Sequence, residues 1–219
     1  MDLFRRIVEA TPAARDQDHI PTLVFSYPQI PERTAAIRSA DRSLVPYLVE
    51  GVRLLERAGA SLIAIPCNTA HYWYDDMQGA VGIPIVHMIQ EAARAAVARL
   101  PGLRRCGLLA TTGTLESGLY ARELECLGVE AVVVEPAVQE AEVMAAIADI
   151  KIRRDRKTSR ERLARAAAAL ERRGAELILL GCTEIPLAFD PATTRLPVLD
   201  GNHVLAEAAI RRYRALGGA

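Results

Sequence analysis

The chain has 219 residues, with 27 basic and 27 acidic side chains, 51% hydrophobic residues and 5% aromatic residues, which is typical of a soluble globular protein. The zero net charge argues against binding to nucleic acid or to an anionic membrane surface, because both normally need a basic excess. No apolar run approaches the roughly 20 residues of a spanning helix, and the N-terminal stretch lacks a secretory core. We therefore expect a cytoplasmic protein that acts on a small molecule.

Short apolar runs alternate with stretches rich in Ala, Leu, Glu and Arg along the whole chain. The pattern predicts helices at 2–10, 32–58, 89–99, 116–126, 138–148, 159–173 and 203–215, and strands at Thr22–Tyr27, Leu62–Ile65, Ile83–Val86, Cys106–Ala110, Ala131–Val134, Leu177–Leu180 and Pro197–Leu199. Strands that alternate with helices form parallel sheets, and continuously apolar strands are covered on both faces. We therefore predict an α/β fold with doubly wound parallel sheets.

The chain also repeats itself at an offset of 115 residues. Residues 55–63, LERAGASLI, match residues 170–178, LERRGAELI, and the same register superimposes Cys67 on Cys182. Each half therefore contains the end of a helix, a turn at a glycine, a strand and then a cysteine just beyond the strand. The repeat predicts two similar lobes, related by internal duplication.

We place the first lobe at residues 1–100 and the second at 101–200, with a helix in 201–219 that packs back on the first lobe. The second lobe opens with a strand and a loop, residues 106–114, whereas Leu3–Arg6 already aligns with Leu119–Arg122. The first lobe is therefore expected to lack an opening strand and loop. A start assigned within a longer gene would explain this difference, and so would a shortened protein with impaired activity.

The two superimposed cysteines each follow a predicted strand, at the edge where doubly wound folds bind ligands. The start of a following helix favours an anion, so we expect thiols there to be acidic. Two thiols across a cleft can invert a stereocentre, because one removes a proton while the other donates one from the opposite face. A single cysteine after a strand is more often a small buried hydrophobe. The superposition of both under the repeat favours catalysis by Cys67 and Cys182.

Short polar residues follow both cysteines. Asn68, Thr69 and Thr183 can hold a carboxylate, and Glu184 could orient Cys182 or shuttle its proton. His71 could bind substrate or simply cap and pack. The remaining cysteines and histidines are predicted to be packing or loop residues: Cys106, Cys126, His19, His87 and His203. The absence of a CxxC pair argues against a thiol redox protein.

Two motifs surround the paired cysteines, PCNTAH at 66–71 and GCTEIPL at 181–187. Three further segments support them: SYPQIPERT at 26–34, GLLATTGTLESGLY at 107–120 and PVLD at 197–200. With these motifs the chain resembles the aspartate/glutamate racemase superfamily, in its aspartate racemase branch, over essentially its whole length. The resemblance implies a racemase without pyridoxal phosphate, metal or other cofactor, with its active site at the lobe interface.

The resemblance also assigns roles to individual residues. Cys67 and Cys182 would be the acid/base pair, and Arg33 and Lys151 would hold the side-chain carboxylate of aspartate. The other residues that it implies in substrate binding are Asn68, Thr69, Thr111, Thr112, Thr183 and Glu184. The chain departs from the family at two places, because Asp200 is followed by glycine rather than a hydroxyl residue and because the opening strand with its GGMGP-type loop is missing.

The expected activity is the interconversion of L- and D-aspartate by two-base proton transfer at Cα. A broad-specificity amino-acid racemase is the nearest alternative, and hydantoin racemisation and maleate isomerisation are more distant ones. A noncatalytic amino-acid-binding homologue is a further alternative from another class. Dimerisation is common in the family, so the resemblance leaves a homodimer open.

Overall fold

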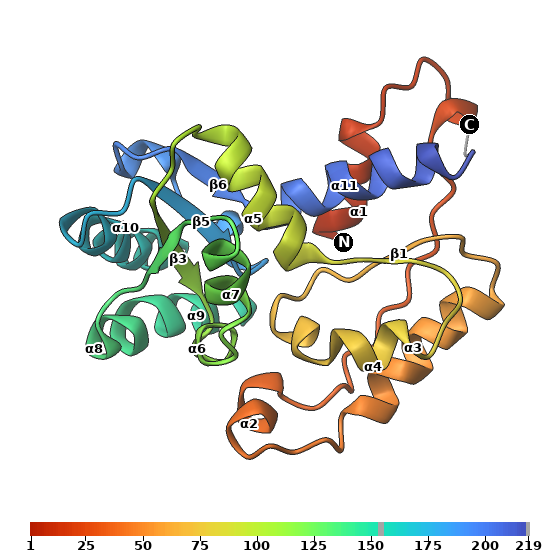
Figure 1. Ribbon diagram of the computed structural model, residues 1–219, viewed down its shortest axis with the longest axis horizontal. Helices are drawn as coiled ribbons and strands as arrows, with labels where there is room; N and C mark the ends of the chain where they lie inside the picture. The colour runs from red at the N-terminus through yellow and green to blue at the C-terminus, as the bar shows by residue number, and fades with distance from the viewer. Residues whose placement is uncertain (153–155, 218–219) are drawn as a thin grey trace.

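A computed structural model describes residues 1–152 and 156–217 (Figure 1). Its strands are β1 (Ile63–Ala64), β2 (Ile85–Val86), β3 (Arg105–Ala110), β4 (Glu130–Val132), β5 (Leu177–Gly181) and β6 (Val198–Asp200). Its α-helices are α1 (Asp2–Ala10), α2 (Arg33–Arg38), α3 (Val45–Arg57), α4 (Tyr74–Gln78), α5 (Met88–Arg99), α6 (Thr112–Glu116), α7 (Leu119–Glu125), α8 (Pro136–Val138), α9 (Ala145–Lys151), α10 (Arg156–Arg172) and α11 (Gly201–Ala215). Within these described residues no helix is long and apolar enough to cross a membrane.

The strands form two parallel sheets, β1-β2 in the first lobe and β4-β3-β5-β6 in the second. Their registers follow the internal repeat residue by residue. Residues 83–86, IPIV, resemble residues 196–199, LPVL, after a small change of offset. Ile63 lies opposite Ile85 in the first sheet, and their counterparts Ile178 and Val198 lie opposite each other in the second. The structure therefore confirms the predicted α/β fold with two similar lobes and parallel sheets.

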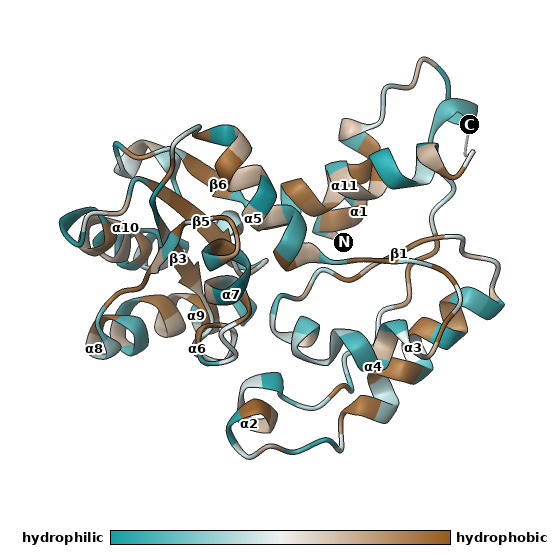
Figure 2. Ribbon diagram, viewed as in Figure 1, coloured by the Kyte–Doolittle hydropathy of each residue, from teal (hydrophilic) through white to brown (hydrophobic). Residues whose placement is uncertain are grey.

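The core of the second lobe lies on both faces of its sheet. All five residues of β5 are buried, and α10 covers one face through Leu163 and Leu170. The helix α5 covers the other face through Ile89 and Ala96, together with α7. The apolar colour of these strands and of the helix faces turned toward them is visible in Figure 2. Burial on both faces explains why these strands read as continuous apolar runs in the sequence.

The helices that follow β2 and β6 cross between the lobes. The helix α5 comes after the last strand of the first sheet but packs in the core of the second. Conversely, α11 comes after the last strand of the second sheet but packs on β1, β2 and α1 (Figure 1). The lobe boundaries at residues 100 and 200 stay predictions, and the packing adds that each sheet is covered by a helix from the other half of the chain.

The predicted strand at Thr22–Tyr27 is wrong. Residues 20–26 have no regular secondary structure and join neither sheet. Leu23 and Val24 are 55% and 56% exposed, so their side chains are not covered as those of an interior strand would be. An apolar run forms a strand only where another strand pairs with it, and within the described part of the chain no strand lies beside this segment.

The predicted helix at 32–58 is also wrong, because the structure divides it into α2 and α3. Ala40 adopts a left-handed conformation with φ of 51°, and the chain turns there. The helix α3 begins at Val45, with Pro46 in its first turn, where proline is tolerated. The predicted helix at 116–126 corresponds to α7, which begins later, at Leu119, after Gly118 with a positive φ of 66°; Glu116 is the last residue of α6. Residues 136–151 are helical as α8, a π-helical segment (Gln139–Met144) and α9.

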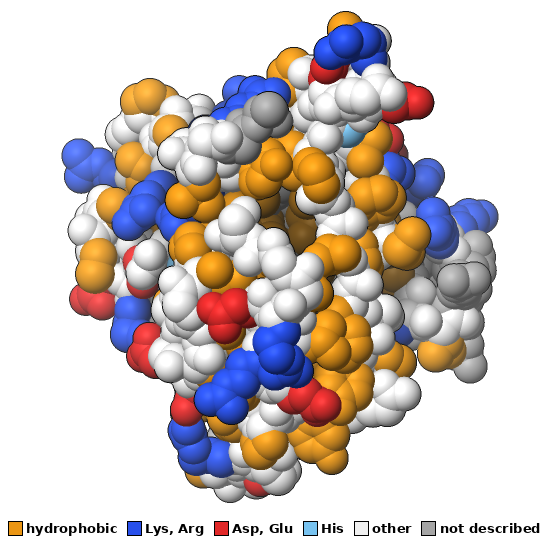
Figure 3. All heavy atoms as spheres, turned by 90° about the vertical axis from the view of Figure 1, so that its right-hand side faces the viewer, with side chains coloured by type: hydrophobic (Ala, Val, Ile, Leu, Met, Phe, Trp, Pro, Cys, Tyr) orange, Lys and Arg blue, Asp and Glu red, His pale blue; other side chains and the backbone are white. Residues whose placement is uncertain are grey.

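An apolar groove opens on the first lobe between β1, residues 20–26, α1 and α11. Its volume is about 730 Å³. Figure 3 looks onto this side of the molecule, where apolar side chains surround a hollow. Residues that line it include Leu3, Ile7, Leu23, Phe25, Leu62 and Ile63.

Candidate active site

The two cysteines lie at the carboxyl ends of corresponding strands. Cys182 directly follows β5, and Cys67 follows β1 after two intervening residues. Short 3₁₀ turns come next in both lobes, at Thr69–Trp73 and at Ile185–Leu187. Turns of five and three residues carry far less dipole than the helices that we expected after the cysteines.

Both cysteines line one small cavity of about 90 Å³ between the lobes. Nine of the ten predicted site residues lie on its wall: Arg33, Cys67, Asn68, Thr69, Thr111, Lys151, Cys182, Thr183 and Glu184. Glu32, Thr34, Pro66 and Gly181 complete the lining. The tenth predicted residue, Thr112, is absent from this wall, and its hydroxyl donates a hydrogen bond to Glu140 Oε1 at 2.8 Å. An enclosed space of this size suits a small metabolite rather than a polymer.

Glu184 accepts a hydrogen bond from the Cys182 thiol, with Sγ and Oε2 3.1 Å apart. The same carboxylate oxygen also accepts from the Thr183 hydroxyl at 3.2 Å. Cys182 is only 6% exposed, and burial raises the pKa of its thiol well above the ordinary value, with the nearby Glu184 charge adding to the rise. Lys151 lowers this pKa, but less. The expectation of an acidic thiol is therefore wrong for Cys182, which is held in its protonated form.

Asn68 is fixed by a tyrosine from the second lobe. The Tyr120 hydroxyl donates to Asn68 Oδ1 at 2.6 Å, and both side chains are buried. Tyr120 has one O–H donor, so this bond determines which end of the Asn68 amide faces the tyrosine. Asn68 is one of the residues that line the cavity, and the other end of its amide, Nδ2, is a buried donor without a partner among the described residues.

Three threonine hydroxyls join the lobes beside the cavity. Thr69 Oγ1 lies 3.1 Å from Thr111 Oγ1 and 2.9 Å from Thr114 Oγ1, and the last two are 2.9 Å apart. All three residues are buried. Thr111 also caps α6 by accepting from the Thr114 backbone N–H. This triangle holds the loop after Cys67 against the loop after β3.

His71 holds the loop that contains Cys67 through hydrogen bonds of both its ring nitrogens. Its Nε2 accepts a hydrogen bond from the Met88 N–H at 3.1 Å, so in the neutral ring the proton is on Nδ1, which lies 2.9 Å from the Cys67 carbonyl oxygen. The ring is 1% exposed, and burial lowers the pKa of His71 to about 4. Of the two roles that the sequence leaves open, the geometry favours packing and positioning, because His71 does not line the cavity.

The two predicted cationic residues come from opposite lobes. Arg33 is the first residue of α2, and its Nη1 donates weakly to the Ile30 and Pro31 carbonyls at 3.4 and 3.3 Å. Lys151 is the last residue of α9. The helix α2 reaches the second lobe by packing on α6, where the Gly113 backbone approaches Thr34 so closely that an added Cβ would lie 2.8 Å from its Cα.

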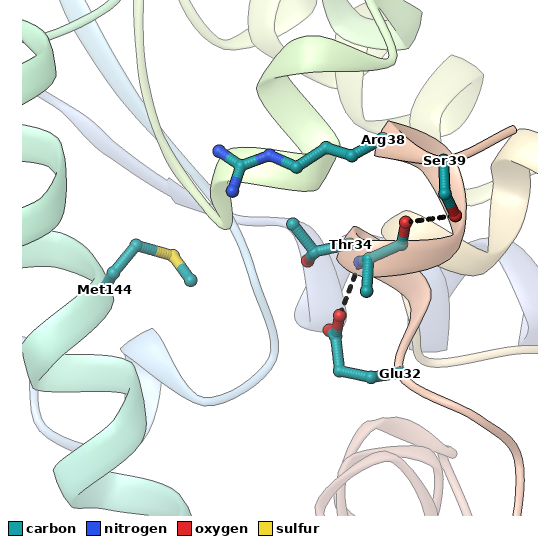
Figure 4. A pocket seen from close by; sticks show the side chains of 6 residues that line it. Glu32, Thr34, Arg38, Ser39 and Met144 are labelled. Atoms are coloured by element: carbon teal, nitrogen blue, oxygen red, sulfur yellow. Dashed lines mark hydrogen bonds between the residues drawn. The ribbon is translucent and has the colours of Figure 1, made fainter.

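A second pocket of about 500 Å³ lies outside the cavity, on the other side of the α2 N-terminus. Figure 4 shows Thr34 and Arg38 of α2 on one side and Met144 of the π-helical segment on the other. The Glu32 carboxylate caps α2 by accepting from the Ala35 N–H, and Glu32 and Thr34 line both pockets. The start of α2 therefore lies between the cysteine cavity and this second pocket.

Two residues that contribute to the site were missed by sequence reasoning. Tyr120 and Thr114 both lie within the segment GLLATTGTLESGLY, yet neither stood out there. A buried tyrosine normally needs a partner for its hydroxyl, which is the one signal that could have drawn attention to Tyr120. Cys106 is buried as expected, whereas Cys126 is exposed at the end of α7, so its predicted packing role is wrong. Among the described residues no group of three or more His, Cys, Asp or Glu side chains could hold a metal ion.

A family model described as Asp/Glu/hydantoin racemase matches residues 1–209. The chain belongs to this family. The resemblance carried by its cysteine motifs is thereby confirmed, and the chain is an isomerase of the amino-acid racemase class. One similar protein is the broad specificity amino-acid racemase of Bacillus subtilis, which is 27% identical over 93% of this chain and 86% of the relative.

Solved structures of similar proteins include aspartate racemases. The aspartate racemase of Picrophilus torridus has a TM-score of 0.83 and 29% sequence identity, over 96% of this chain and 87% of that one. An aspartate racemase homologue from Pyrococcus horikoshii has a TM-score of 0.76 and 26% identity, over 97% of this chain and 92% of that one. These similarities agree with the aspartate branch of the family.

Proposed function

We propose that this racemase interconverts L- and D-aspartate by proton transfer between Cys67, Cys182 and the Cα atom of the substrate. One observation carries the proposal: two cysteines related by the internal repeat line the same small cavity, one from each lobe. A repeat that supplies equivalent thiols from opposite sides suits a reaction whose substrate and product are mirror images. Cys106 and Cys126 line neither this cavity nor the other two pockets described above.

In one direction, Cys67 acts as a thiolate and takes the Cα proton. The electron pair of the broken C–H bond moves into the α-carboxylate as an enolate-like intermediate. The Cys182 thiol then gives its proton to the opposite face of Cα and is left as a thiolate. The high pKa of Cys182 supports its role as the proton donor in this direction, because burial and Glu184 keep the thiol protonated until Cα accepts the proton. The reverse direction exchanges the two roles.

The donors around the cavity fit a dicarboxylate. Asn68 Nδ2 is the buried donor without a partner, and we assign it to the α-carboxylate together with Thr69 and Thr183. Holding that carboxylate also stabilises the enolate-like intermediate, in which its negative charge increases. We assign the side-chain carboxylate to Arg33 and Lys151, the two cationic residues of the lining. The similarity to the Picrophilus torridus aspartate racemase supports this assignment.

A racemase of broad specificity is the second candidate. It is favoured by the similarity to the Bacillus subtilis relative of that name, which extends over 93% of the chain. Arg33 also supports it, because the hydrogen bonds that its guanidinium donates within the described residues are long ones to main-chain carbonyls, those of Ile30 and Pro31. In this alternative Cys67 and Cys182 keep their roles, and only the side-chain pocket differs.

The test is solvent deuterium incorporation at Cα of L- and D-aspartate, followed by mass spectrometry. We expect exchange in the wild type and its loss in Cys67→Ala and in Cys182→Ala, while the buried Cys106→Ala serves as a control outside the cavity. Exchange that survives both site substitutions would refute the two-thiol mechanism. No exchange in a wild type that still binds aspartate would identify a noncatalytic binding protein. A panel of neutral and basic amino acids then separates aspartate specificity from broad specificity.

A further inference from the structure

Two side chains form the wall between the cysteine cavity and the pocket of about 500 Å³ beside it, which we call the outer pocket. Glu32 and Thr34 line both spaces. Arg33, which lies between them in the sequence, lines the cavity and not the outer pocket. Open space therefore lies directly behind the part of the cavity wall from which Arg33 enters.

The side-chain end of the substrate faces this wall in the proposed function, because Arg33 and Lys151 hold the side-chain carboxylate there. The bonds that the Arg33 guanidinium donates to the Ile30 and Pro31 carbonyls are 3.4 and 3.3 Å long, so they hold it weakly. A guanidinium held in this way can shift with the carboxylate of a longer side chain. The length of the substrate is therefore limited by the wall rather than by the position of Arg33.

Of the two side chains in the wall, Thr34 is the one that is held in place. Gly113 of α6 lies so close that a Cβ added there would be 2.7 Å from Thr34 Oγ1 and 2.9 Å from its Cβ. Thr34 is also β-branched, which restricts its rotamers. Glu32 is exposed, and its carboxylate turns to the Ala35 N–H, from which it accepts at 2.6 Å. Thr34 thus forms the rigid part of the wall.

The outer pocket has room for an additional methylene and no unbalanced cation that would repel one. Met144 faces Thr34 across the pocket (Figure 4), and methionine side chains adapt their shape to irregular spaces. The Arg38 guanidinium at the edge of the pocket is paired with Glu116 through two bonds of 2.8 Å. Removing the side chain of Thr34 would therefore join the cavity to an accommodating space.

We propose that Thr34 determines the substrate specificity of this racemase by limiting the substrate to one methylene between Cα and the side-chain carboxylate. The hydroxyl and methyl groups of Thr34 fill the space that the second methylene of glutamate requires. One methylene in a closed pocket changes the discrimination between substrates by about 10- to 200-fold. The inference rests on the proposed function, because it takes the side-chain carboxylate to lie at Arg33 and Lys151.

The test compares L-aspartate with L-glutamate in Thr34→Ala and in two matched controls. Thr34→Val removes the hydroxyl group but keeps the volume of the side chain, and Ser39→Ala changes a residue that lines the outer pocket and not the cavity. Deuterium exchange at Cα gives kcat/KM for both amino acids, and isothermal titration calorimetry gives their dissociation constants. Circular dichroism verifies the fold, and Thr34→Ser, which removes the methyl group alone, provides a milder second variant.

We expect the ratio of kcat/KM for glutamate to that for aspartate to rise by about tenfold or more in Thr34→Ala. Thr34→Ser should give an intermediate ratio, and both controls should keep the wild-type ratio. The proposal is overturned if Thr34→Ala and Thr34→Ser keep the wild-type ratio, if Thr34→Val raises it as much as Thr34→Ala, or if the wild type already uses glutamate as well as aspartate. The proposed function fails separately, when aspartate shows no exchange or exchanges without the two cysteines. The ratio of the two dissociation constants then tests Thr34 by the same criteria.

Discussion

Acidification should destabilise the protein through His71 before most carboxylates titrate. In the unfolded chain this side chain has a pKa near 6.5, whereas burial lowers it to about 4 in the folded protein. Between these values the unfolded state binds a proton that the folded state does not, so the free energy of unfolding falls as the pH decreases from about 6.5 to 4. A shift of about 2.5 pKa units at 1.36 kcal/mol each gives a total loss of about 3 kcal/mol, of which about 2 kcal/mol is lost by pH 5.

The contacts of His71 link this loss to the site. A proton on Nε2 would face the Met88 N–H, which now donates to that atom, so protonation breaks this bond of a ring that also contacts the Cys67 carbonyl. Urea unfolding at pH 7 and pH 5 measures the effect in wild type and in His71→Gln, with the exposed His203→Gln as a matched control. We expect the difference between the two pH values to shrink by about 2 kcal/mol in His71→Gln alone. An unchanged difference in that variant would refute the reasoning.

Three further substitutions test the contacts around the cavity. In Tyr120→Phe the buried Asn68 Oδ1 loses its hydrogen-bond donor, so we expect the free energy of unfolding to fall by about 1–3 kcal/mol and KM for aspartate to rise. Urea unfolding and steady-state kinetics measure these two quantities. Wild-type values of both would contradict the assigned bond. In Glu184→Gln the pKa of Cys182 should fall because a negative charge is removed, so alkylation of Cys182 at pH 8, followed by mass spectrometry, should accelerate. Cys106, whose pKa burial alone raises to about 12, is the internal control, and an equal acceleration there would indicate general loosening. Gly113→Ala should force α2 away from α6, lower the free energy of unfolding by about 1–3 kcal/mol and raise KM. Gly51→Ala is the control, because the atoms nearest to its added Cβ are 3.7 Å away, and it should change neither quantity. Equal effects of the two substitutions would contradict the close approach of Gly113 to Thr34.

The features that the sequence predicts correctly depend on short segments of the chain and on its internal repeat. The strands β3, β5 and β6 are apolar runs in a parallel sheet, and the repeat places Cys67 and Cys182 at equivalent strand ends. The segment Thr22–Tyr27 has the same apolar pattern, but a strand also needs a second strand beside it. The residues of the segment itself do not show that this second strand is missing in the described part of the chain.

The features that sequence reasoning missed depend on contacts between distant segments. Tyr120 and Asn68 are 52 residues apart in the chain, and neither residue type predicts a hydrogen bond to the other. The pKa of Cys182 is likewise set by burial, which no motif specifies, and by Glu184, whose orientation toward the thiol depends on the loop conformation. The packing of α5 in the second lobe and of α11 on the first also consists of contacts between distant segments.

The exchange of α5 and α11 gives the chain the arrangement of a domain-swapped homodimer whose two copies have been joined end to end. In such a dimer the two thiols would be identical by symmetry, so both would have the same neighbouring side chains. Joining the copies removes that constraint, because each half can then change alone. Here Cys67 is followed by Asn68, whereas Cys182 is followed by Thr183 and then by Glu184, so the two thiols have different polar neighbours.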